Sequence, residues 1–375
     1  MNRPLYIIDS SIDVTGAFAC LKNQAIALDG TTPVIIALPS KSRIPEAELA
    51  PFAEVVRLPI INIRRSVRSL LLYLPCLLIA SIRLRLHMRR HQAAALQVND
   101  FYMMHGVVCH FLGFRGTLLT WIRCDPSRYG KLLASVWLRL GDRYSQEMIS
   151  VSKYIQKLVS DRCHSTVLYD CIPPVDVDDA LTPYPFPKEQ CSAVYIGNYI
   201  RGKGQCHAID AFSRIQSCVP NLHLHFFGGD MGLLKNMAYR EEVVATAEKL
   251  GLQNRIHFHG FAERPASVLA GADFALNFSE SESFSLTCLE AGFHGVPMIA
   301  TRCGGPEEIV EHGKTGFLVE LGDTATMASC MKTLATNSSL ANEMGSAAAR
   351  HTREKFSREQ FITGLSRLLP SDSVS

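Results

Sequence analysis

Residues 274–301 read FALNFSESESFSLTCLEAGFHGVPMIAT, and this stretch decides the fold. Its two ends, 274–277 and 297–300, are short apolar runs with the length of buried strands. Between them, small and polar residues lead into a helix that we expect to start near Ser285. Two strands joined by a helix form a βαβ unit, in which the strands are parallel. The stretch therefore predicts an α/β fold built on a parallel sheet with helices on its faces.

The same alternation extends outward through both halves of the chain. The first half has predicted strands at 5–8, 33–38, 101–104, 117–121, 148–152 and 166–169, with helices at 16–29 and 153–157. The second half has them at 193–197, 223–227, 256–260, 274–277, 297–300 and 316–319, with a helix at 205–218. The pattern predicts two doubly wound, Rossmann-like domains facing a central cleft. Ligands of such sheets bind outside the carboxyl ends of the strands, so we expect the site in that cleft.

A domain boundary is indicated near residues 172–190. Residues 172–176 are Ile-Pro-Pro-Val-Asp, which continue neither a helix nor a strand. The charge also changes sign there: residues 1–175 hold 21 basic and 12 acidic residues (+9), and residues 176–375 hold 17 and 23 (−6). We therefore expect one domain at 1–172 and a second at 173–355, with different partners.

The composition excludes several classes of protein. Hydrophobic residues make up 47% and charged residues 19%, which excludes disorder of the whole chain. The 12 cysteines contain no Cys-x-x-Cys pair, so we expect reduced thiols and neither a disulfide framework nor a zinc site. The first apolar run is broken at Asp9, too early for a signal-peptide core, and we expect a cytoplasmic protein.

The polar segment after the strand at 274–277 carries chemistry for an anionic, hydroxylated ligand. The N–H groups at the start of the following helix form an anion site. Glu282 precedes that helix and can point into the cleft. Glu290 lies about one turn in, where its carboxylate can accept hydrogen bonds from the two hydroxyls of a ribose or hexose diol. The alternative is that both glutamates are merely solvated surface residues.

This region resembles the retaining GT-B glycosyltransferases of family 4. Their signature is two glutamates with seven residues between them, a spacing that Glu282 and Glu290 share. Residues 290–297 (Glu-Ala-Gly-Phe-His-Gly-Val-Pro), 301–309 (Thr-Arg-Cys-Gly-Gly-Pro-Glu-Glu-Ile) and 313–319 (Gly-Lys-Thr-Gly-Phe-Leu-Val) are similar to the segments that follow in that family. The resemblance covers residues 190–370 well and residues 1–175 loosely.

The resemblance implies roles for the residues of this segment. Glu290 would bind the donor ribose and Glu282 would contact the transferred sugar. The backbone amides around Phe284, Ser285 and Leu286 would hold sugar or phosphate. The family has glycines where this chain has Ser283 and Ser285, a departure that bears on which donor is used.

Residues 197–204 (Gly-Asn-Tyr-Ile-Arg-Gly-Lys-Gly) form a second motif, in a turn from a strand into a helix. The family has a similar turn, in which Gly197 and Lys203 match. There Lys203 would stabilise the diphosphate leaving group. The family's arginine position is Asn198 here, and Arg201 is expected to supply the missing charge. Without the resemblance, an exposed basic turn is the better interpretation of these residues.

The first half contributes fewer candidates. Gly16 lies in a small-residue loop that resembles the one near the acceptor and the donor phosphate. The family often has a histidine after the strand at 117–121, but here the nearest polar residues are Arg123 and Asp125. We assign Gly16, His105 and Arg123 to the cleft side of this domain.

Residues 64–90 raise the question of a membrane. An apolar stretch of 14 residues, 69–82, is flanked by arginines on both sides. It is too short to span a bilayer, and Pro75 would kink a helix. It is either an interfacial helix on anionic lipid or a buried helix with a solvated basic end. The charge of the first half favours membrane contact, and because no nucleic-acid module occurs we expect no nucleic-acid partner.

The sequence and the resemblance together predict a retaining hexosyltransferase. Its second domain would bind a nucleotide-sugar, and its first a glycan or lipid-linked acceptor of envelope polysaccharide or lipopolysaccharide synthesis, at the inner face of the cytoplasmic membrane. A last helix, within 356–375, would return to the first domain. No metal or other cofactor is expected. The alternatives are a non-catalytic GT-B scaffold or glycan-binding subunit, and a nucleotide-sugar epimerase.

Overall fold

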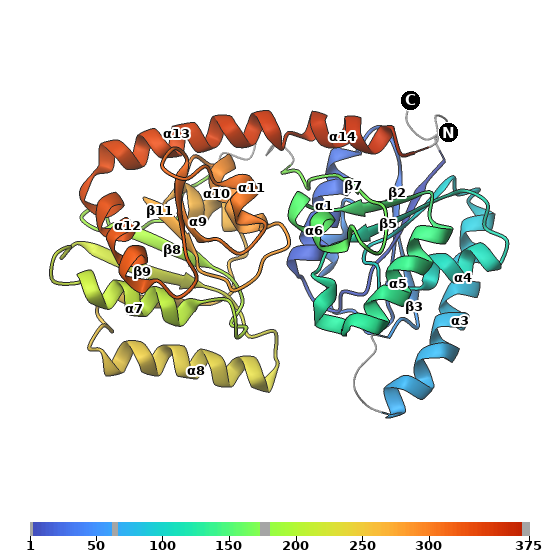
Figure 1. The fold of residues 1–375 in the computed structure, drawn as a ribbon, viewed down its shortest axis with the longest axis horizontal. Helices are drawn as coiled ribbons and strands as arrows, with labels where there is room; N and C mark the ends of the chain where they lie inside the picture. Colours follow the sequence, from blue (N-terminus) through green and yellow to red (C-terminus); the bar gives the residue numbers. More distant parts are fainter. Residues whose placement is uncertain (1–2, 62–66, 173–180, 370–375) are drawn as a thin grey trace. The chain divides into compact units, whose positions relative to one another are not determined.

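The computed structural model describes residues 3–61, 67–172 and 181–369. The chain forms two compact units, one of residues 1–173 with 356–375 and one of residues 174–355 (Figure 1). Each unit is a parallel sheet with helices on its faces, so the predicted pair of Rossmann-like α/β domains is confirmed.

The described residues of the N-terminal unit form a seven-stranded sheet in the order β3-β2-β1-β4-β5-β6-β7. Its strands are β1 (Leu5–Ile8), β2 (Val34–Pro39), β3 (Glu54–Leu58), β4 (Ala95–Val98), β5 (Thr117–Ile122), β6 (Glu147–Ser150) and β7 (Thr166–Val167). Its helices are α1 (Gly16–Ala27), α2 (Glu46–Leu49), α3 (Val67–Arg90), α4 (His105–Phe111), the 3-10 turn η1 (Pro126–Tyr129), α5 (Lys131–Tyr144), α6 (Lys153–Val159) and α14 (Arg358–Ser366).

The described residues of the second unit form a six-stranded sheet in the order β10-β9-β8-β11-β12-β13. Its strands are β8 (Cys191–Ile196), β9 (Leu222–Phe227), β10 (Ile256–His259), β11 (Phe274–Asn277), β12 (Met298–Thr301) and β13 (Gly316–Val319). Its helices are α7 (Gln205–Ile215), α8 (Leu234–Lys249), α9 (Pro265–Ala270), α10 (Leu286–Phe293), α11 (Pro306–Ile309), α12 (Thr324–Thr336) and α13 (Ser338–Lys355).

Both sheets have the Rossmann strand order, in which the chain starts in the middle and works first to one edge and then to the other. Most strand positions are apolar because helices cover both faces of each sheet, with exceptions that include the edge strand β3 and the histidines of β9 and β10. In the second unit, Phe212 of α7 packs into one core with Tyr195 of β8 and Phe274 of β11, and all three are almost fully buried. Each such side chain stabilises the fold by roughly 1.5–3 kcal/mol through burial alone.

The end of the chain belongs to the N-terminal unit. Arg358, the first residue of α14, donates from Nε to the backbone carbonyl of Ala27 at the end of α1, at 3.0 Å. The rings of Tyr169 and Phe356 meet edge to face with centroids 5.1 Å apart.

Two strands of the N-terminal sheet were not predicted, and one prediction was wrong. Residues 101–104 form a turn before α4, and the strand there is β4, at Ala95–Val98. Gln97 breaks the apolar pattern of β4, but its buried amide exchanges two hydrogen bonds with Gln24 of α1, at 2.7 and 3.0 Å. Strand β3 is a partly exposed edge strand whose sequence, Glu-Val-Val-Arg-Leu, lacks a continuous apolar run.

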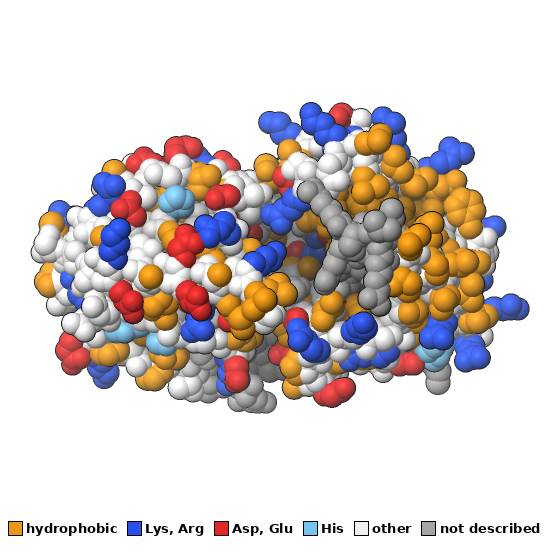
Figure 2. All heavy atoms as spheres, turned by 90° about the horizontal axis from the view of Figure 1, so that it is seen from below, with side chains coloured by type: hydrophobic (Ala, Val, Ile, Leu, Met, Phe, Trp, Pro, Cys, Tyr) orange, Lys and Arg blue, Asp and Glu red, His pale blue; other side chains and the backbone are white. Residues whose placement is uncertain are grey.

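Helix α3 is longer than the 14-residue apolar stretch suggested. It has 24 residues, with Pro75 inside it. Within Leu71–Arg90, an 18-residue window has a mean hydropathy of 1.4. By length and composition alone this is the one helix among the described residues that is long and apolar enough to cross a membrane. The prediction that the apolar stretch is too short to span a bilayer was wrong as to length, because leucines continue between the arginines beyond Ile82. A large share of its apolar side chains is exposed (Figure 2).

Candidate active site

The strongest candidate site lies at the switch point of the second sheet. Strands β8 and β11 are neighbours in the middle of the sheet, and the chain leaves them toward opposite edges. In parallel α/β sheets ligands bind at such a point, outside the carboxyl ends of the strands. The loops that follow these two strands are residues 197–204 and 278–285, and both carry predicted site residues.

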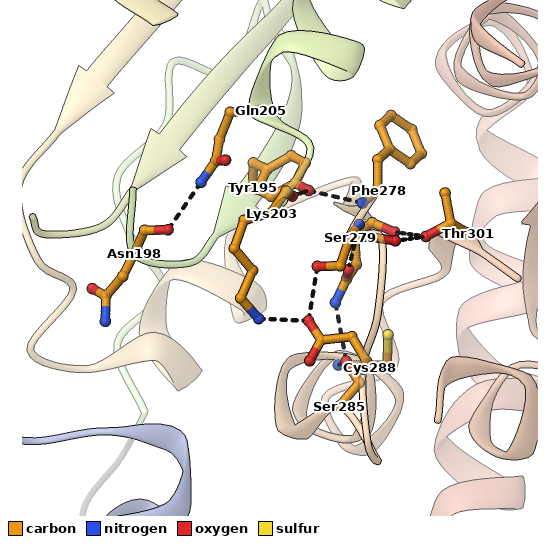
Figure 3. A network of polar contacts seen from close by, with 11 residues as sticks. Tyr195, Asn198, Lys203, Gln205, Phe278, Ser279, Ser285, Cys288 and Thr301 are labelled. Atoms are coloured by element: carbon orange, nitrogen blue, oxygen red, sulfur yellow. Dashed lines mark hydrogen bonds and ion pairs between the residues drawn. The ribbon is translucent and has the colours of Figure 1, made fainter. Parts of the chain in front are cut away.

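The structure brings Lys203 and Glu282 together. The Lys203 Nζ lies 2.7 Å from Oε1 of Glu282, and the Ser279 hydroxyl donates to the same oxygen at 2.8 Å (Figure 3). The Glu282 side chain is 15% exposed and that of Lys203 is 33% exposed. A cation and a carboxylate 79 residues apart in sequence thus form one partly buried pair that an incoming ligand can reach.

A hydrogen-bonded frame holds the two loops to each other. The Tyr195 hydroxyl donates to the Lys203 carbonyl and accepts from the backbone N–H of Phe278, the latter at 2.8 Å. The Thr301 hydroxyl donates to the carbonyl of Ser279 at 2.6 Å. Sequence analysis missed Tyr195, Ser279 and Thr301, although each lies at or just beyond the carboxyl end of one of the parallel strands β8, β11 and β12.

The loop that carries Lys203 also crosses close to the backbone of β11. Gly204 has φ +79°, and a Cβ there would lie 2.0 Å from the carbonyl oxygen of Phe278. Only glycine allows this approach, because both the left-handed conformation and the contact with backbone exclude a side chain.

We expect Gly204→Ala to destabilise the protein by about 2 kcal/mol or more, since strain and overlap add. Thermal unfolding will measure this. The control is Gly197→Ala in the same loop, where φ is not positive and a Cβ meets nothing within 4 Å. Equal melting temperatures for the two variants would contradict the close approach.

Ser285 occupies the position where a glycine was expected from the resemblance. Its φ is +89°, in the region that glycine adopts most readily, and it is the N-cap of α10. Its hydroxyl accepts from the N–H of Cys288 at 3.4 Å and from Nδ2 of Asn277 at 3.0 Å. These two hydrogen bonds offset the backbone strain that a residue with a Cβ incurs here.

The start of α10 faces the same loops. Leu286 is its first residue, so the N–H groups of the first turn have no partners within the helix. The preceding Phe284 is buried, and Gly305 lies so close that a Cβ on it would be 2.2 Å from the carbonyl oxygen of Phe284. The predicted anion-binding segment is therefore held in place from its far side.

Glu290 lies on α10, just over one turn after the N-cap. Its side chain is partly buried, and burial raises its pKa from 4.5 to about 7. Within the part of the chain that the structure describes, its carboxylate has no hydrogen-bond or ion-pair partner. A half-buried carboxylate without donors is suited to accept hydrogen bonds from hydroxyl groups of a ligand.

Two residues of the 197–204 loop differ from expectation. Asn198 braces the loop: its Oδ1 accepts from the N–H of Gly229 at 3.1 Å, and its carbonyl accepts from Gln205. Arg201 is not brought to Lys203. It is largely exposed, forms an ion pair with Glu242 of α8, and lies over the ring of Tyr239 at 5.0 Å. The structure therefore does not support the expectation that Arg201 adds positive charge beside Lys203. The side chain of Arg201 is paired instead with the carboxylate of Glu242 and the ring of Tyr239, both on α8.

In the N-terminal unit, Arg123 is committed to internal contacts. Its side chain is 5% exposed. It donates from Nη1 to both carboxylate oxygens of Asp170, at 2.8 and 2.9 Å, and from Nε to Oδ1 of Asn99 at 2.6 Å. Arg123 was predicted to face the cleft. In the structure its hydrogen bonds instead link the segments that follow β4, β5 and β7. Gly16 is the first residue of α1, and no atom would contact a Cβ there.

His105 is buried at the start of α4 and lines a small aromatic cavity. The cavity is about 110 Å³ and also has Tyr73, Tyr129 and Trp137 in its wall. Neither ring nitrogen of His105 has a hydrogen-bond partner among the described residues, and burial lowers its pKa to about 4. His105 is thus neutral at physiological pH.

One group among the described residues has the geometry to hold a metal ion: Glu54, His87 and His91. It lies on β3 and at the end of α3, in the N-terminal unit. Nε2 of His87 is 3.0 Å from Oε1 of Glu54, and the hydroxyl of Tyr6 is 2.8 Å from its Nδ1. These contacts already account for the cluster as a network of polar contacts at the edge of the sheet.

The fold and the site together define a GT-B protein. The solved structure of Anabaena Alr3699/HepE in complex with UDP and glucose superposes with a TM-score of 0.79, at 20% identity, over 98% of this chain and 99% of that chain.

Residues 177–351, which contain the Lys203–Glu282 pair and Glu290, match the family model for glycosyl transferases, group 1. N-acetyl-alpha-D-glucosaminyl L-malate synthase of Bacillus anthracis is 37% identical over 121 residues, which are 32% of each chain. The lipopolysaccharide core biosynthesis glycosyltransferase LpsE of Rhizobium meliloti (strain 1021) is 24% identical over 185 residues, 49% of this chain and 51% of LpsE. The chain thus matches about a third to a half of the length of these curated relatives.

Proposed function

We propose that this protein is a glycosyltransferase that transfers a hexose from a nucleotide-sugar with retention of the anomeric configuration. The observation that carries the proposal is the meeting of the Lys203–Glu282 pair and the start of α10 at the switch point of the second sheet. This arrangement falls inside the segment that matches the glycosyl transferase family model.

Each group has a role that follows from its chemistry. Lys203 turns from Glu282 to the β-phosphate and stabilises the departing diphosphate, assisted by the N–H groups at the start of α10. Glu282, freed from Lys203, accepts hydrogen bonds from hydroxyls of the sugar. Glu290 accepts them from the ribose diol, and the donated hydrogen bonds lower its raised pKa.

The bond between the anomeric carbon and the phosphate oxygen breaks, and a bond from that carbon to an acceptor oxygen forms on the same face. The proton of the acceptor hydroxyl passes to the departing phosphate oxygen. No protein nucleophile is assigned. No step in this scheme requires a metal ion, because Lys203 and backbone N–H groups provide the positive charge.

We further propose that the acceptor is a glycan or a lipid-linked glycan of envelope polysaccharide or lipopolysaccharide synthesis, bound by the N-terminal unit at the inner face of the cytoplasmic membrane. Support comes from the curated name of LpsE, a lipopolysaccharide core enzyme, and from the basic character of residues 1–175. We propose uridine as the first nucleoside to test in the donor, because the HepE structure is a complex with UDP and glucose.

The experiment is a proton NMR time course with UDP-glucose, UDP-N-acetylglucosamine, GDP-mannose or ADP-glucose, in which water serves as the acceptor. We expect one α-linked donor to be consumed, with the nucleoside diphosphate and the α-anomer of the sugar appearing first. The β-anomer appearing first would contradict retention. An isomeric nucleotide-sugar without free diphosphate would indicate the epimerase. No reaction and no nucleotide binding would indicate the non-catalytic scaffold or glycan-binding subunit.

A further inference from the structure

Helix α3 has two apolar faces, of which the fold uses one. The inner face packs into the core of the N-terminal unit and consists of Tyr73, Leu77, Ala80, Leu84 and Met88. The outer face repeats at the same helical spacing and consists of Leu71, Leu74, Leu78, Ile82 and Leu86. These outer side chains are between 39% and 70% exposed. A surface helix of a soluble protein normally carries polar residues on its outer face. This exposed apolar stripe therefore indicates a surface that binds another molecule or a membrane.

Neighbouring helices extend the exposed apolar surface. Phe111 and Leu112 at the end of α4 are exposed, as are Leu132, Leu133 and Val136 at the start of α5. Both helices lie beside α3: Arg85 of α3 donates to the carbonyl of Gly113 just after α4, at 3.0 Å, and Tyr73 shares a cavity wall with Trp137 of α5. We call the exposed apolar residues of α3, α4 and α5 the apolar face. Figure 2 shows it as an orange region on the right, with blue side chains around it.

The charge around the apolar face is almost entirely positive. Helix α3 contains no acidic residue, and its second half carries Arg83, Arg85, Arg89 and Arg90. Further exposed cations lie on or beside α4 and α5: Arg115, Lys131, Arg139 and Arg143. The acidic residue among the described residues of α3, α4 and α5 is Asp142. Exposed leucines bordered by arginines match the acyl and headgroup layers of an anionic bilayer.

We propose that the apolar face of α3, α4 and α5 docks the N-terminal unit onto an anionic lipid bilayer, with α3 lying in the plane of the interface. Helix α3 does not cross the bilayer, because that would remove Ala80, Leu84 and Met88 from the core of the unit. A second copy of the chain is a poorer occupant, since a symmetric contact would set the arginines of one copy against those of the other. The proposal does not depend on the transfer reaction.

The test is flotation of the full chain with vesicles. We expect binding to vesicles that contain phosphatidylcholine and about one third phosphatidylglycerol, at least tenfold tighter than to phosphatidylcholine alone. Added salt should weaken the binding, because it screens the arginines. We expect two variants to bind at least tenfold more weakly than the wild type. One is the double variant Leu74→Glu with Leu78→Glu, and the other is the triple variant Arg83→Gln with Arg89→Gln and Arg90→Gln.

The matched control is Leu234→Glu on α8 of the second unit, a leucine that is 84% exposed, compared with 67% for Leu74 and 49% for Leu78. It should bind vesicles like the wild type, and all variants should keep the wild-type melting temperature because the changed side chains are exposed. The proposal is overturned if the wild type stays with the unbound protein, or if the leucine variant floats as well as the wild type. It is also overturned if the leucine variant only turns a dimer into a monomer on a sizing column, which would assign the face to a second copy.

Discussion

Replacing Lys203 by methionine is expected to lower the rate of sugar transfer by a factor of about 10² to 10³. The diphosphate leaves with additional negative charge, and Lys203 is the cation that the structure holds against Glu282 at the switch point, 2.7 Å away. Methionine keeps most of the side-chain volume and removes only the charge. The rate is measured by release of the nucleoside diphosphate at saturating donor, with the melting temperature recorded alongside.

The control for this prediction is Arg201→Met in the same loop. Arg201 is 71% exposed and bound to Glu242 of α8, so its loss should change the rate less than about threefold. If Arg201→Met and Lys203→Met impaired transfer equally, the leaving group would be stabilised by the charge of the loop as a whole. The assignment to Lys203 would then be wrong.

The second large effect is expected from Glu290→Gln. A carboxylate that accepts hydrogen bonds from a diol contributes about 2 kcal/mol, so the variant should bind the nucleoside diphosphate roughly 30-fold more weakly. Calorimetric titration measures this. A 2′,3′-dideoxy nucleotide provides the matched control, because it lacks the diol and should bind the wild type and the variant with equal affinity. A loss of affinity for the dideoxy nucleotide as well would contradict a contact between Glu290 and the ribose.

The same substitution has an opposite effect on the protein without nucleotide. The folded-state pKa of Glu290 is raised to about 7 from 4.5 by burial, so between these values the unfolded chain loses a proton that the folded chain keeps. The free energy of unfolding therefore falls as the pH rises from about 4.5 to about 7. Above pH 7 the ionised, half-buried carboxylate continues to destabilise the folded chain. We expect Glu290→Gln to remove this part of the pH dependence and to melt higher than the wild type at pH 8. A variant that melts lower at pH 8 would contradict the raised pKa.

The sequence predicts the second unit better than the first, for physical reasons. Its strands are mostly apolar runs, with histidines between apolar residues in β9 and β10, and the segment from Phe274 to Val319 has several ordered motifs. In the first unit, β4 contains Gln97, whose polarity is offset by Gln24 far away in sequence. Strand β3 is an exposed edge without an apolar run. A pattern within a window of residues cannot reveal a partner that the fold brings in from elsewhere.

The same reason explains which candidate site residues could be predicted from the sequence. Lys203, Glu282 and Glu290 were predicted from motifs with fixed local spacing. Arg201 was misassigned because Glu242 and Tyr239, which hold it, lie about 40 residues farther along. The hydrogen bonds of Tyr195 and Thr301 also join the ends of neighbouring strands. Which strands are neighbours is known only from the order of the sheet. The positive φ of Ser285 gives a structural reason for a glycine at that place, which the sequence comparison could not supply.

The second unit is proposed to bind a nucleotide-sugar at Lys203, Glu282 and Glu290. The most direct measurement is thermal unfolding of the wild type and of Glu290→Gln at pH 8 with UDP, GDP, ADP or CDP in excess. A nucleotide that binds the folded chain raises its melting temperature by mass action. We predict that one nucleoside diphosphate raises the melting temperature of the wild type and raises that of the variant much less. Stabilisation of both proteins to the same extent, or of neither by any nucleotide, would contradict the account.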